Sequence, residues 1–373
     1  MKKLGFGTMR LPLTDPEDKT AIDMEQTCRM VDLFLEQGFT YFDTAYMYHN
    51  YESERAVKKA LTDRHPRESY LLADKLPLSM IKEADEMGPI FEEQLLKCGV
   101  DYFDYYLLHC VNTANYEKAQ RFHAFDFAME KKAEGKAKKI GFSYHDSASL
   151  LEEILKAHPE MEFVQLQLNY IDWDSPNIQS RLCYEVCQKY GKPVIVMEPV
   201  KGGILANVSE DVETLMRRYA PEASPASWAV RFAASQEQVI MVLSGMSDEA
   251  QLLDNMAYMQ DFKPLNDAET EIIGQITERM NAKTDIACTG CGYCVEGCPR
   301  HIPIPRYFAL YNQLKKYGSK SNSGAYYGNF RGKAGLASDC IGCRRCEGAC
   351  PQHLTVVEYL KKVAAEFETP TKA

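Results

Sequence analysis

Eight of the thirteen cysteines lie in the last quarter of the chain, in two copies of one spacing pattern. The copies read Cys288-x-x-Cys291-x-x-Cys294-x-x-x-Cys298-Pro299 and Cys340-x-x-Cys343-x-x-Cys346-x-x-x-Cys350-Pro351. Three cysteines with two residues between them can bind one [4Fe–4S] cluster, and the fourth cysteine, before proline, ligates the other cluster in two-cluster ferredoxins. The spacing therefore predicts two clusters, the first bound by Cys288, Cys291, Cys294 and Cys350, and the second by Cys340, Cys343, Cys346 and Cys298.

Zinc is the main alternative for these cysteines, because four thiolates also form structural zinc sites. Zinc sites normally present two CxxC pairs rather than one CxxCxxCxxxCP run, so the spacing favours iron–sulfur clusters. We read no secretory signal in the first residues, which favours a metal framework over disulfides. We expect the other five cysteines to be inert buried side chains: Cys28, Cys98, Cys110, Cys183 and Cys187.

A second set of chemically capable residues lies in the first third of the chain. Asp43, Tyr48, Lys75 and His109 each stand at or just past the end of a β-rich run. Together they could reduce a carbonyl group, because hydride attack on C=O leaves an alkoxide that needs a proton. A tyrosine becomes an effective proton donor when a neighbouring cation lowers its pKa, so we predict Tyr48 as the donor and Lys75 as that cation. Asp43 would hold Lys75, and His109 would orient the carbonyl.

The elements that would position these residues alternate between strands and helices. Strands are expected at 4–7, 40–43, 70–74, 104–109, 139–143, 163–168, 193–198 and 239–244. Amphipathic helices are expected at 24–37, 52–63, 90–98, 116–133, 148–157, 176–190, 225–235 and 248–258. Eight such units in about 260 residues predict an α/β fold, the (β/α)8 TIM barrel, whose active sites lie at the C-terminal strand ends. No GxGxxG motif follows an early strand, which disfavours a Rossmann sheet.

Three segments follow from this pattern. Residues 1–264 form the predicted barrel, 265–284 a linking helix, and 285–373 a small, mainly helical two-cluster ferredoxin-like domain. The long gap between Cys298 and Cys340 is more typical of helical two-cluster modules than of a compact ferredoxin. The elements expected in the last segment are a helix at 305–317, a loop at 318–324 and a final helix at 353–367.

Charge is unevenly distributed along the chain. The net charge is −10, but residues 1–284 carry −15 and residues 285–373 carry +5. The C-terminal Lys and Arg residues can offset the negative charge of thiolate-ligated clusters. An acidic chain argues against nucleic acid as the main partner. No run approaches the 18 or so apolar residues of a membrane span, so we expect no membrane partner and a cytoplasmic protein.

The barrel segment resembles the aldo-keto reductase family in the motifs that carry the four polar residues. The similar segments are GFGTMR at 5–10, YFDTAYMY at 41–48, ADK at 73–75, DYYLLH at 104–109, GFS at 141–143, VQLQLNY at 164–170 and SGMS at 244–247. The whole chain resembles the iron–sulfur branch of that family, which carries a C-terminal 4Fe–4S domain. The resemblance implies a catalytic tetrad of Asp43, Tyr48, Lys75 and His109, and NAD(P) bound across the barrel mouth.

The resemblance also implies four groups of NAD(P) contacts. The nicotinamide ribose would lie against Gly7, Thr8, Met9 and Arg10, and the carboxamide against Ser143 and Gln165. The pyrophosphate would lie under Pro199, Gly203 and Leu205. The adenosine end would meet Ser244, Gly245, Met246, Ser247, Gln251 and Asn255.

Three residues depart from the family's pattern. His49 follows Tyr48 where glycine is usual, which could reshape the substrate mouth. Glu198 stands where many members place an aromatic residue or a serine near the nicotinamide. Gln251 stands where NADPH-preferring members often place an arginine for the 2′-phosphate. Without that cation NADPH loses a charge-assisted contact, so NADH and NADPH both stay open.

The predicted parts allow several functions. The first is an NAD(P)H-dependent carbonyl reductase or alcohol dehydrogenase whose clusters exchange electrons with a redox partner protein. The clusters could instead be structural or redox-sensing beside a self-contained reductase, because nicotinamide transfers two electrons together and each cluster transfers one. A flavin in the nicotinamide site would bridge this mismatch, and a non-enzymatic electron-transfer protein would avoid it. The intact tetrad favours an enzyme with a small carbonyl or alcohol substrate.

Overall fold

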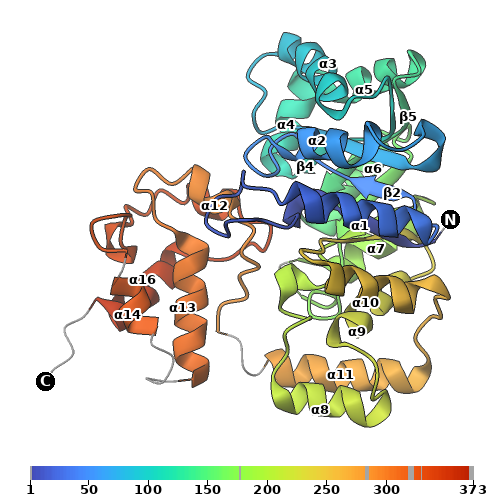
Figure 1. Ribbon diagram of the computed structural model, residues 1–373. Coiled ribbons are helices and arrows are strands. Elements are labelled where there is room, and N and C mark those ends of the chain that lie inside the picture. The colour runs from blue at the N-terminus through green and yellow to red at the C-terminus, as the bar shows by residue number, and fades with distance from the viewer. Residues whose placement is uncertain (1, 176–177, 282–284, 318–322, 329, 369–373) are drawn as a thin grey trace, which may run out of the picture. The chain divides into compact units, whose positions relative to one another are not determined.

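The protein forms two compact units, Met1–Val200 with Ala220–Thr270, and Lys201–Tyr219 with Glu271–Ala373. The computed structural model describes residues 2–175, 178–281, 285–317, 323–328 and 330–368 (Figure 1). The first unit contains the barrel, and the second contains both cysteine runs. Compared with the predicted boundaries, residues 201–219 group with the C-terminal part of the chain rather than with the barrel.

The first unit is built on a closed barrel of parallel strands that follow each other in chain order (Figure 1). The strands are β1 (Leu4–Gly7), β2 (Tyr41–Asp43), β3 (Leu71–Leu76), β4 (Phe103–Val111), β5 (Ala137–Tyr144), β6 (Phe163–Gln167), β7 (Val194–Met197) and β8 (Val239–Ser244). Strand β1 pairs with both β2 and β8, which closes the barrel. The predicted (β/α)8 barrel is confirmed.

Helices surround this barrel and cover the outer faces of its strands (Figure 1). They are α1 (Met24–Glu36), α2 (Ser53–Val57), α3 (Met87–Cys98), α4 (Thr113–Arg121), α5 (Ala124–Ala133), α6 (Ala148–Ala157), α7 (Ser180–Lys189), α9 (Pro225–Ala234) and α10 (Glu249–Gln260). The single helix predicted at 116–133 is wrong, because His123 has a φ of 56° and this left-handed residue separates α4 from α5.

Side-chain alternation along the strands leads from the core directly into the site. One buried cluster contains side chains of β2, β3, β4, β6, β7 and β8. Because these strands lie on opposite sides of the barrel, the cluster fills the barrel interior. Two residues further along a strand, the next side chain points to the same face. The resulting pairs, core residue first, are Tyr41 and Asp43, Ala73 and Lys75, Leu107 and His109, and Phe163 and Gln165. The polar residues therefore form the layer above the core, at the C-terminal mouth.

The second unit is helical. Its helices are α8 (Glu210–Tyr219), most of α11 (Asp267–Asn281), α12 (Tyr293–Glu296), α13 (Ile304–Tyr317), α14 (Ser323–Gly328), α15 (Arg345–Gly348) and α16 (Val356–Phe367). Helices α11, α13 and α16 match predicted helices, but α8 buries only Val212 and Met216, a stripe too thin to be recognised in the sequence. The loop predicted at 318–324 is wrong at its end, where α14 begins, and residues 318–322 lie outside the described residues.

One core holds the second unit together, and cysteines belong to it. Tyr307, Phe308 and Leu360 are fully or almost fully buried in this core. The motif cysteines Cys294, Cys346 and Cys350 are buried among these side chains, and Cys288, Cys298 and Cys340 pack against them.

The cysteines outside the motifs only partly follow the expectation of inert buried thiols. Cys98, Cys183 and Cys187 are buried, but Cys28 and Cys110 are partly exposed, so the prediction is wrong for these two. The Cys110 thiol is nevertheless enclosed enough that burial raises its pKa to about 11. A thiol with a raised pKa is a poor nucleophile at neutral pH.

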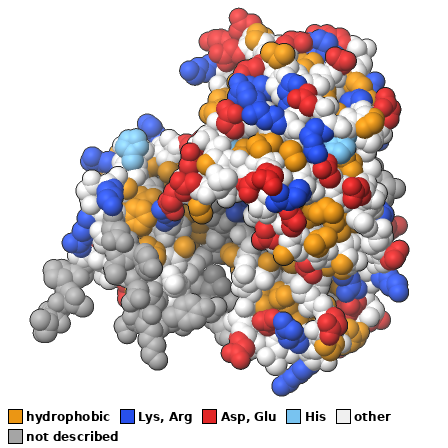
Figure 2. Space-filling view, in the orientation of Figure 1, with side chains coloured by type: hydrophobic (Ala, Val, Ile, Leu, Met, Phe, Trp, Pro, Cys, Tyr) orange, Lys and Arg blue, Asp and Glu red, His pale blue; other side chains and the backbone are white. Residues whose placement is uncertain are grey.

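Basic and acidic side chains are interspersed over the face of the first unit seen in Figure 2. A surface with mixed charges is typical of a protein exposed to water. Within the described part of the chain, no helix is long and apolar enough to cross a membrane.

Candidate active site and cluster sites

Lys75 is the centre of the site at the barrel mouth. Its Nζ donates hydrogen bonds to Asp43 Oδ1 at 2.5 Å and to the Thr44 carbonyl at 2.5 Å. The same Nζ lies 3.4 Å from the Tyr48 hydroxyl and 4.8 Å from the centre of the Tyr48 ring. Lys75 is 0% exposed and Asp43 is 3% exposed. The fold thus places the ammonium between a buried carboxylate and the phenol, as the sequence predicts.

Asp43 is held from several sides. Gln165 Nε2 donates to Asp43 Oδ2 at 3.1 Å, and Thr8 Oγ1 donates to the Asp43 carbonyl at 2.9 Å. Burial raises the pKa of Asp43, while Lys75 and the Gln165 hydrogen bond offset part of that rise. Ser53 shares hydrogen bonds with the hydroxyls of Thr8 and Thr44, at 2.8 and 2.9 Å. Sequence reasoning missed Ser53, because a single serine in an amphipathic helix carries no distinctive signal.

The pKa of Tyr48 shifts in the opposite direction to the prediction. Burial raises it well above the ordinary value of 10, and the Asp43 carboxylate raises it further. The expectation that Lys75 lowers this pKa is therefore wrong for the chain on its own, because desolvation and nearby carboxylates outweigh one ammonium. The phenol consequently stays protonated at neutral pH, which is the state that a proton donor needs.

His109 completes the predicted tetrad from strand β4. Its ring lies edge-on to that of Tyr48, with centroids 6.1 Å apart and an angle of 82°. Burial and then the Lys75 charge lower the pKa of His109 well below its ordinary value, so the imidazole is neutral. Among the described residues, no group bonds to its buried Nδ1. Protonation at Nε2 leaves only an acceptor unpaired at Nδ1 and gives Nε2 a proton to donate to a carbonyl oxygen.

The segment after Tyr48 has an unusual backbone. Residues 49–51 have φ values of 52°, 51° and 72°, all in the left-handed region that most side chains avoid. His49 Nε2 accepts the Leu11 N–H at 3.2 Å, so the ring carries its proton on Nδ1, which donates to the Lys19 carbonyl at 2.8 Å. These contacts fasten the Tyr48 loop to the segment after β1. The role at the substrate mouth expected for His49 stays a prediction.

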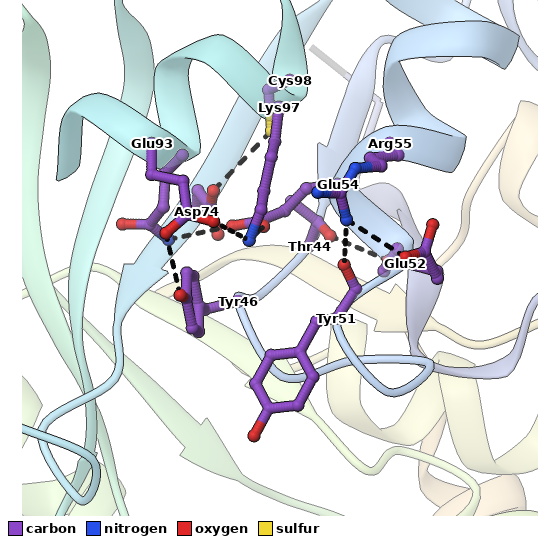
Figure 3. Close-up of polar contacts among 12 residues, drawn as sticks. Thr44, Tyr46, Tyr51, Glu52, Glu54, Arg55, Asp74, Glu93, Lys97 and Cys98 are labelled. Atoms are coloured by element: carbon purple, nitrogen blue, oxygen red, sulfur yellow. Dashed lines mark hydrogen bonds and ion pairs between the residues drawn. The ribbon is translucent and has the colours of Figure 1, made fainter. Parts of the chain in front are cut away.

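Side chains on the outer side of β3 clamp the Lys75 backbone. Figure 3 shows two of the residues involved, Asp74 and Glu54, near Lys97. Asp74 precedes Lys75 and points to the opposite face, where its Oδ1 accepts the Lys75 N–H at 2.8 Å. Gln94 of α3 donates to the Lys75 carbonyl at 3.0 Å and to Glu54 Oε1 at 3.2 Å. Asp74, Glu54 and Gln94 are all 0% exposed. This clamp fixes the strand position from which the ammonium reaches Asp43.

Burial raises the pKa values of both Asp74 and Glu54 in this network. Burial raises the pKa of Asp74 well above its ordinary value, and the Glu54 carboxylate raises it further. Lys97 lies 3.5 Å from Glu54 and 2.7 Å from Glu93, and it offsets part of the burial-driven rise in the Glu54 pKa. A proton therefore resides on Asp74. The sequence signal for this network was an acidic residue, Glu54, within the apolar face of the predicted helix 52–63.

The residues implied for NAD(P) lie at strand ends and on one helix. Gly7 ends β1, and Thr8, Met9 and Arg10 form a 3-10 turn after it. Ser143 is on β5, Gln165 on β6 and Pro199 two residues after β7. Ser244 ends β8, Gly245, Met246 and Ser247 follow it, and Gln251 and Asn255 are on α10. Gly203 and Leu205 belong to the second unit.

Contacts at these positions fit a bound nicotinamide. The Ser143 hydroxyl accepts the Cys110 N–H at 2.7 Å and keeps its hydrogen for another acceptor. Gln165 uses its Nε2 on Asp43 and keeps its amide oxygen as an acceptor. One donor and one acceptor are what a carboxamide requires. A Cβ on Gly7 would lie 3.3 Å from the Ser244 carbonyl, so glycine keeps this edge of the mouth free of side chains.

Gln251 is engaged at the N-terminus of α10. Its N–H and Nε2 donate to the Asp248 carboxylate, both at 2.8 Å, and its Oε1 accepts the Ser247 N–H at 2.9 Å. Among the described residues, Gln251 thus bonds to Ser247 and to a carboxylate rather than to a cation, and NADH and NADPH both stay open. Glu198 has a φ of 55°, its carbonyl accepts from Asn169 at 3.1 Å, and its carboxylate contributes to the raised pKa of Tyr48.

The structure groups the motif cysteines into the two predicted sets. Burial raises the pKa of Cys294, and its neighbours Cys291, Cys288 and Cys350 raise it further, which places these four sulfurs near one another. The other set lines one cavity, and its members are Cys298, Cys340, Cys343 and Cys346. The fourth cysteine of each run thus lies with the first three of the other run.

The spacing of these sulfurs fits clusters better than zinc. Within the described ranges, no three His, Cys, Asp or Glu side chains converge closely enough to hold a single metal ion. Zinc would draw four sulfurs to about 2.3 Å from one point, whereas a cluster core lies between its ligands and keeps them farther apart.

Comparison with known proteins decides the family. The model of the aldo/keto reductase family matches residues 3–278. The chain belongs to the aldo/keto reductase family. A model of a 4Fe-4S dicluster domain matches residues 287–355. This aldo/keto reductase therefore has a C-terminal dicluster domain, which implies two 4Fe–4S clusters, as predicted.

The curated relatives differ in how much of the chain they share. The NADPH-dependent alpha-keto amide reductase of Saccharomyces cerevisiae is 30% identical over 55% of this chain and 62% of its own length. The 9,11-endoperoxide prostaglandin H2 reductase of Trypanosoma cruzi is 23% identical over 74% and 88%. The acetyl-CoA decarbonylase/synthase complex subunit alpha 1 of Methanosarcina acetivorans is 31% identical over 27% and 11%. The chain thus spans less than two thirds of the yeast and Methanosarcina proteins.

Solved structures share the barrel fold. An aldo-keto reductase of Bacillus halodurans in its holo form aligns with a TM-score of 0.59 and 23% identity, over 74% of this chain and 91% of that one. An aldo-keto reductase of Klebsiella pneumoniae in complex with NADPH aligns with a TM-score of 0.58 and 19% identity, over 74% and 90%.

Proposed function

We propose that this aldo/keto reductase reduces a small carbonyl compound with NAD(P)H, and that Tyr48 is the proton donor. The observation that carries the proposal is the Lys75 ammonium, 2.5 Å from the Asp43 carboxylate and 3.4 Å from the Tyr48 hydroxyl. The yeast relative, by name an NADPH-dependent alpha-keto amide reductase, supports this class of reaction. Bound NAD(P)H supplies the hydride.

The chain's own residues hold the carbonyl and move one proton. The Tyr48 hydroxyl and the neutral His109 imidazole donate hydrogen bonds to the carbonyl oxygen and polarise it. As negative charge develops on that oxygen, the Tyr48 O–H bond breaks and a new O–H bond forms on the product alcohol. The phenolate left behind is stabilised by Lys75, which Asp43 holds in place. In the reverse direction, the phenolate takes the proton of an alcohol.

Replacement of Tyr48 tests the assignment of the donor. In Tyr48→Phe, NAD(P)H-driven carbonyl reduction is expected to fall by about 10²- to 10⁴-fold, because proton transfer by a positioned side chain contributes about this much. Iron content should stay unchanged, since Tyr48 is in the first unit. Tyr51→Phe is the matched control, because Tyr51 is 42% exposed on the same loop. Undiminished reduction by Tyr48→Phe would show that the donor is another group.

We also propose that the two cysteine sets bind two [4Fe–4S] clusters that exchange single electrons with a redox partner protein. A structural role is the second candidate, because Cys294, Cys346 and Cys350 are buried in the core of their unit. Replacement of Cys291 by Ser separates the two roles. If the clusters exchange electrons, the parent protein should deliver electrons to a one-electron acceptor and the variant should not. If the clusters are only structural, even the parent protein should deliver none.

Cofactor analysis after anaerobic purification complements this test. Two clusters require iron and sulfide in equal amounts, about eight of each per chain. A co-purified flavin would favour a flavin-linked route between two-electron and one-electron chemistry, and a co-purified nicotinamide alone would favour hydride transfer without it.

A further inference from the structure

Three buried polar side chains of the second unit lie beside one cysteine set. Lys201, Thr289 and Gln352 are 3%, 6% and 4% exposed. Thr289 directly follows Cys288, and Gln352 is two residues after Cys350. These two cysteines come from different runs but belong to the same set. Both polar side chains therefore flank proposed ligands of the same cluster.

Lys201 fixes the orientation of the Gln352 amide. Its Nζ donates to Gln352 Oε1 at 2.9 Å. An ammonium can only donate, so the amide oxygen must face Lys201 and the amide nitrogen must face away. That nitrogen, Gln352 Nε2, is buried and makes no hydrogen bond within the described part of the chain. Gln352 thus offers two oriented N–H groups to an acceptor.

Thr289 offers another donor of the same kind. Its Oγ1 is also buried without a hydrogen-bond partner among the residues described. A buried polar group without a partner is destabilising and rare in folded proteins. In the described residues of the second unit, Thr289 and Gln352 contribute the only side-chain atoms of this kind. Cluster sulfur accepts hydrogen bonds, so a cluster at this cysteine set fits both donors.

The backbone at Gly202 brings Lys201 to this place. Gly202 has a φ of 65°, and a Cβ there would lie 2.3 Å from the Thr289 carbonyl oxygen. No other residue allows so close an approach, because real Cβ atoms do not come within 3.0 Å of such an atom. The glycine therefore lets the turn pack against the loop that begins at Cys288, and the same turn carries the buried Lys201.

We propose that Lys201, Thr289 and Gln352 raise the reduction potential of the cluster bound by Cys288, Cys291, Cys294 and Cys350, with Thr289 Oγ1 and Gln352 Nε2 donating hydrogen bonds to cluster sulfur. One-electron reduction adds a negative charge to a cluster, and donors together with a buried ammonium stabilise the more negative state. Among the described residues of the second unit, no buried side-chain donor without a partner lies at the other cysteine set, whose cavity is lined by Arg300, Arg344 and Arg345. This inference rests on the cluster assignment proposed above.

The test measures two midpoint potentials in the full-length protein. Dithionite titration followed by electron paramagnetic resonance is applied to the parent protein, Lys201→Met, Thr289→Val and Gln352→Glu. One potential is expected to fall in each variant while the other stays, by about 59 mV if reduction becomes tenfold less favourable. Gln352→Glu keeps a partner for Lys201 but loses the N–H donors and adds a negative charge, so its fall supports the proposal only together with that of Thr289→Val, which removes a donor without changing the charge.

Lys361→Met is the matched control, because Lys361 is an exposed lysine of the same unit that pairs with Glu358. Its two potentials should equal those of the parent protein. Equal potentials in all three variants, at full iron content, would overturn the inference. A parent protein without two clusters would instead overturn the cluster assignment. If Lys201→Met loses iron, Thr289→Val decides the question, since it removes only a hydroxyl.

Discussion

Tyr48 and Lys75 show why a proposed catalytic pair cannot be evaluated from residue types alone. A lysine beside a tyrosine indicates a lowered tyrosine pKa, yet burial and the Asp43 carboxylate raise it. In the proposed reaction, the ammonium 3.4 Å away would therefore act on the phenolate more than on the resting phenol. Under the proposed function, the site would stabilise the product of proton transfer.

The raised pKa of Tyr48 predicts how the reaction rate depends on pH. A raised pKa means that the proton-donating form of Tyr48 is present at all pH values below the folded-state pKa, which lies above 10.0, and is lost only above it. We expect kcat/KM for carbonyl reduction to show no loss through Tyr48 between neutral pH and pH 10, and alcohol oxidation to increase over the same range. Pre-steady-state or steady-state rates across this range check the prediction. A decline in reduction near neutral pH that persists in a His109→Gln control would contradict it.

The residues that the sequence could identify are those whose type and position both carry information. Asp43, Lys75 and His109 stand two residues beyond core side chains of their strands, a pattern that strand periodicity makes visible. Ser53 and Gln94 contact the same groups from helices, where nothing in the sequence distinguishes them from other buried polar residues. Their roles depend on contacts between distant segments.

At the scale of elements, α2 and α3 support the site from outside the barrel. Asp74 on β3 stays protonated because burial and Glu54 raise its pKa. The folded state therefore binds a proton that the unfolded chain releases above about pH 4, so stability falls as the pH rises from there toward the folded-state pKa.

Replacement of Asp74 by a side chain that does not titrate should make the free energy of unfolding less dependent on pH. Asp74→Asn keeps the size of the side chain but has no acid proton to lose, so its free energy of unfolding should decrease less than that of the parent protein as the pH rises. Urea denaturation from acidic to alkaline pH measures this difference. Asp126→Asn is the control, since the Asp126 side chain is 76% exposed. Parallel profiles for Asp74→Asn and the parent protein would mean that Asp74 is ionised in the fold.

A two-point ion pair fastens the start of α11 to α9. Arg231 of α9 donates to both carboxylate oxygens of Glu269, at 2.7 and 3.0 Å, and the two side chains are only 16% and 7% exposed. Glu269→Gln leaves a largely buried arginine without its counter-charge, so we expect a loss of about 1–3 kcal/mol in the free energy of unfolding. Glu213→Gln breaks the exposed pair with Arg217 and should cost less than about 1 kcal/mol. Equal losses in the two variants, measured by urea denaturation, would contradict this ranking.

Helix and strand ends were predictable to different degrees. Strands β1 and β8 and helix α6 begin and end where their patterns indicate, because turn residues and apolar periodicity agree there. The interruption at His123 could not be foreseen, since a left-handed residue other than glycine leaves no signature in the sequence. Neither could the left-handed run at 49–51.

At the scale of the whole molecule, chain order and compact units do not coincide. Residues 201–219 follow β7 in sequence but group with residues 271–373, and Lys201 and Gly202 contact Gln352 and Thr289 there. Local patterns cannot reveal such a grouping, because it depends on contacts between residues 87 to 151 positions apart. A cut after residue 264 would therefore separate 201–219 from the residues with which it packs.

Loss of the clusters should act on the two units differently. Cluster ligands that belong to a core couple metal binding to folding, and Cys294, Cys346 and Cys350 are buried in the core of the second unit. We expect removal of iron by a chelator under oxidising conditions to lower the thermal stability of the second unit strongly and that of the first unit little.

Calorimetry should then show one early and one late transition, and limited proteolysis should cut within 201–219 as well as within the C-terminal residues. Because 201–219 is bounded by residues of the first unit, cleavage there would be the clearest sign that the segment depends on the clusters. A single transition that shifts as a whole, with no cuts in 201–219, would mean that this segment keeps its structure without them.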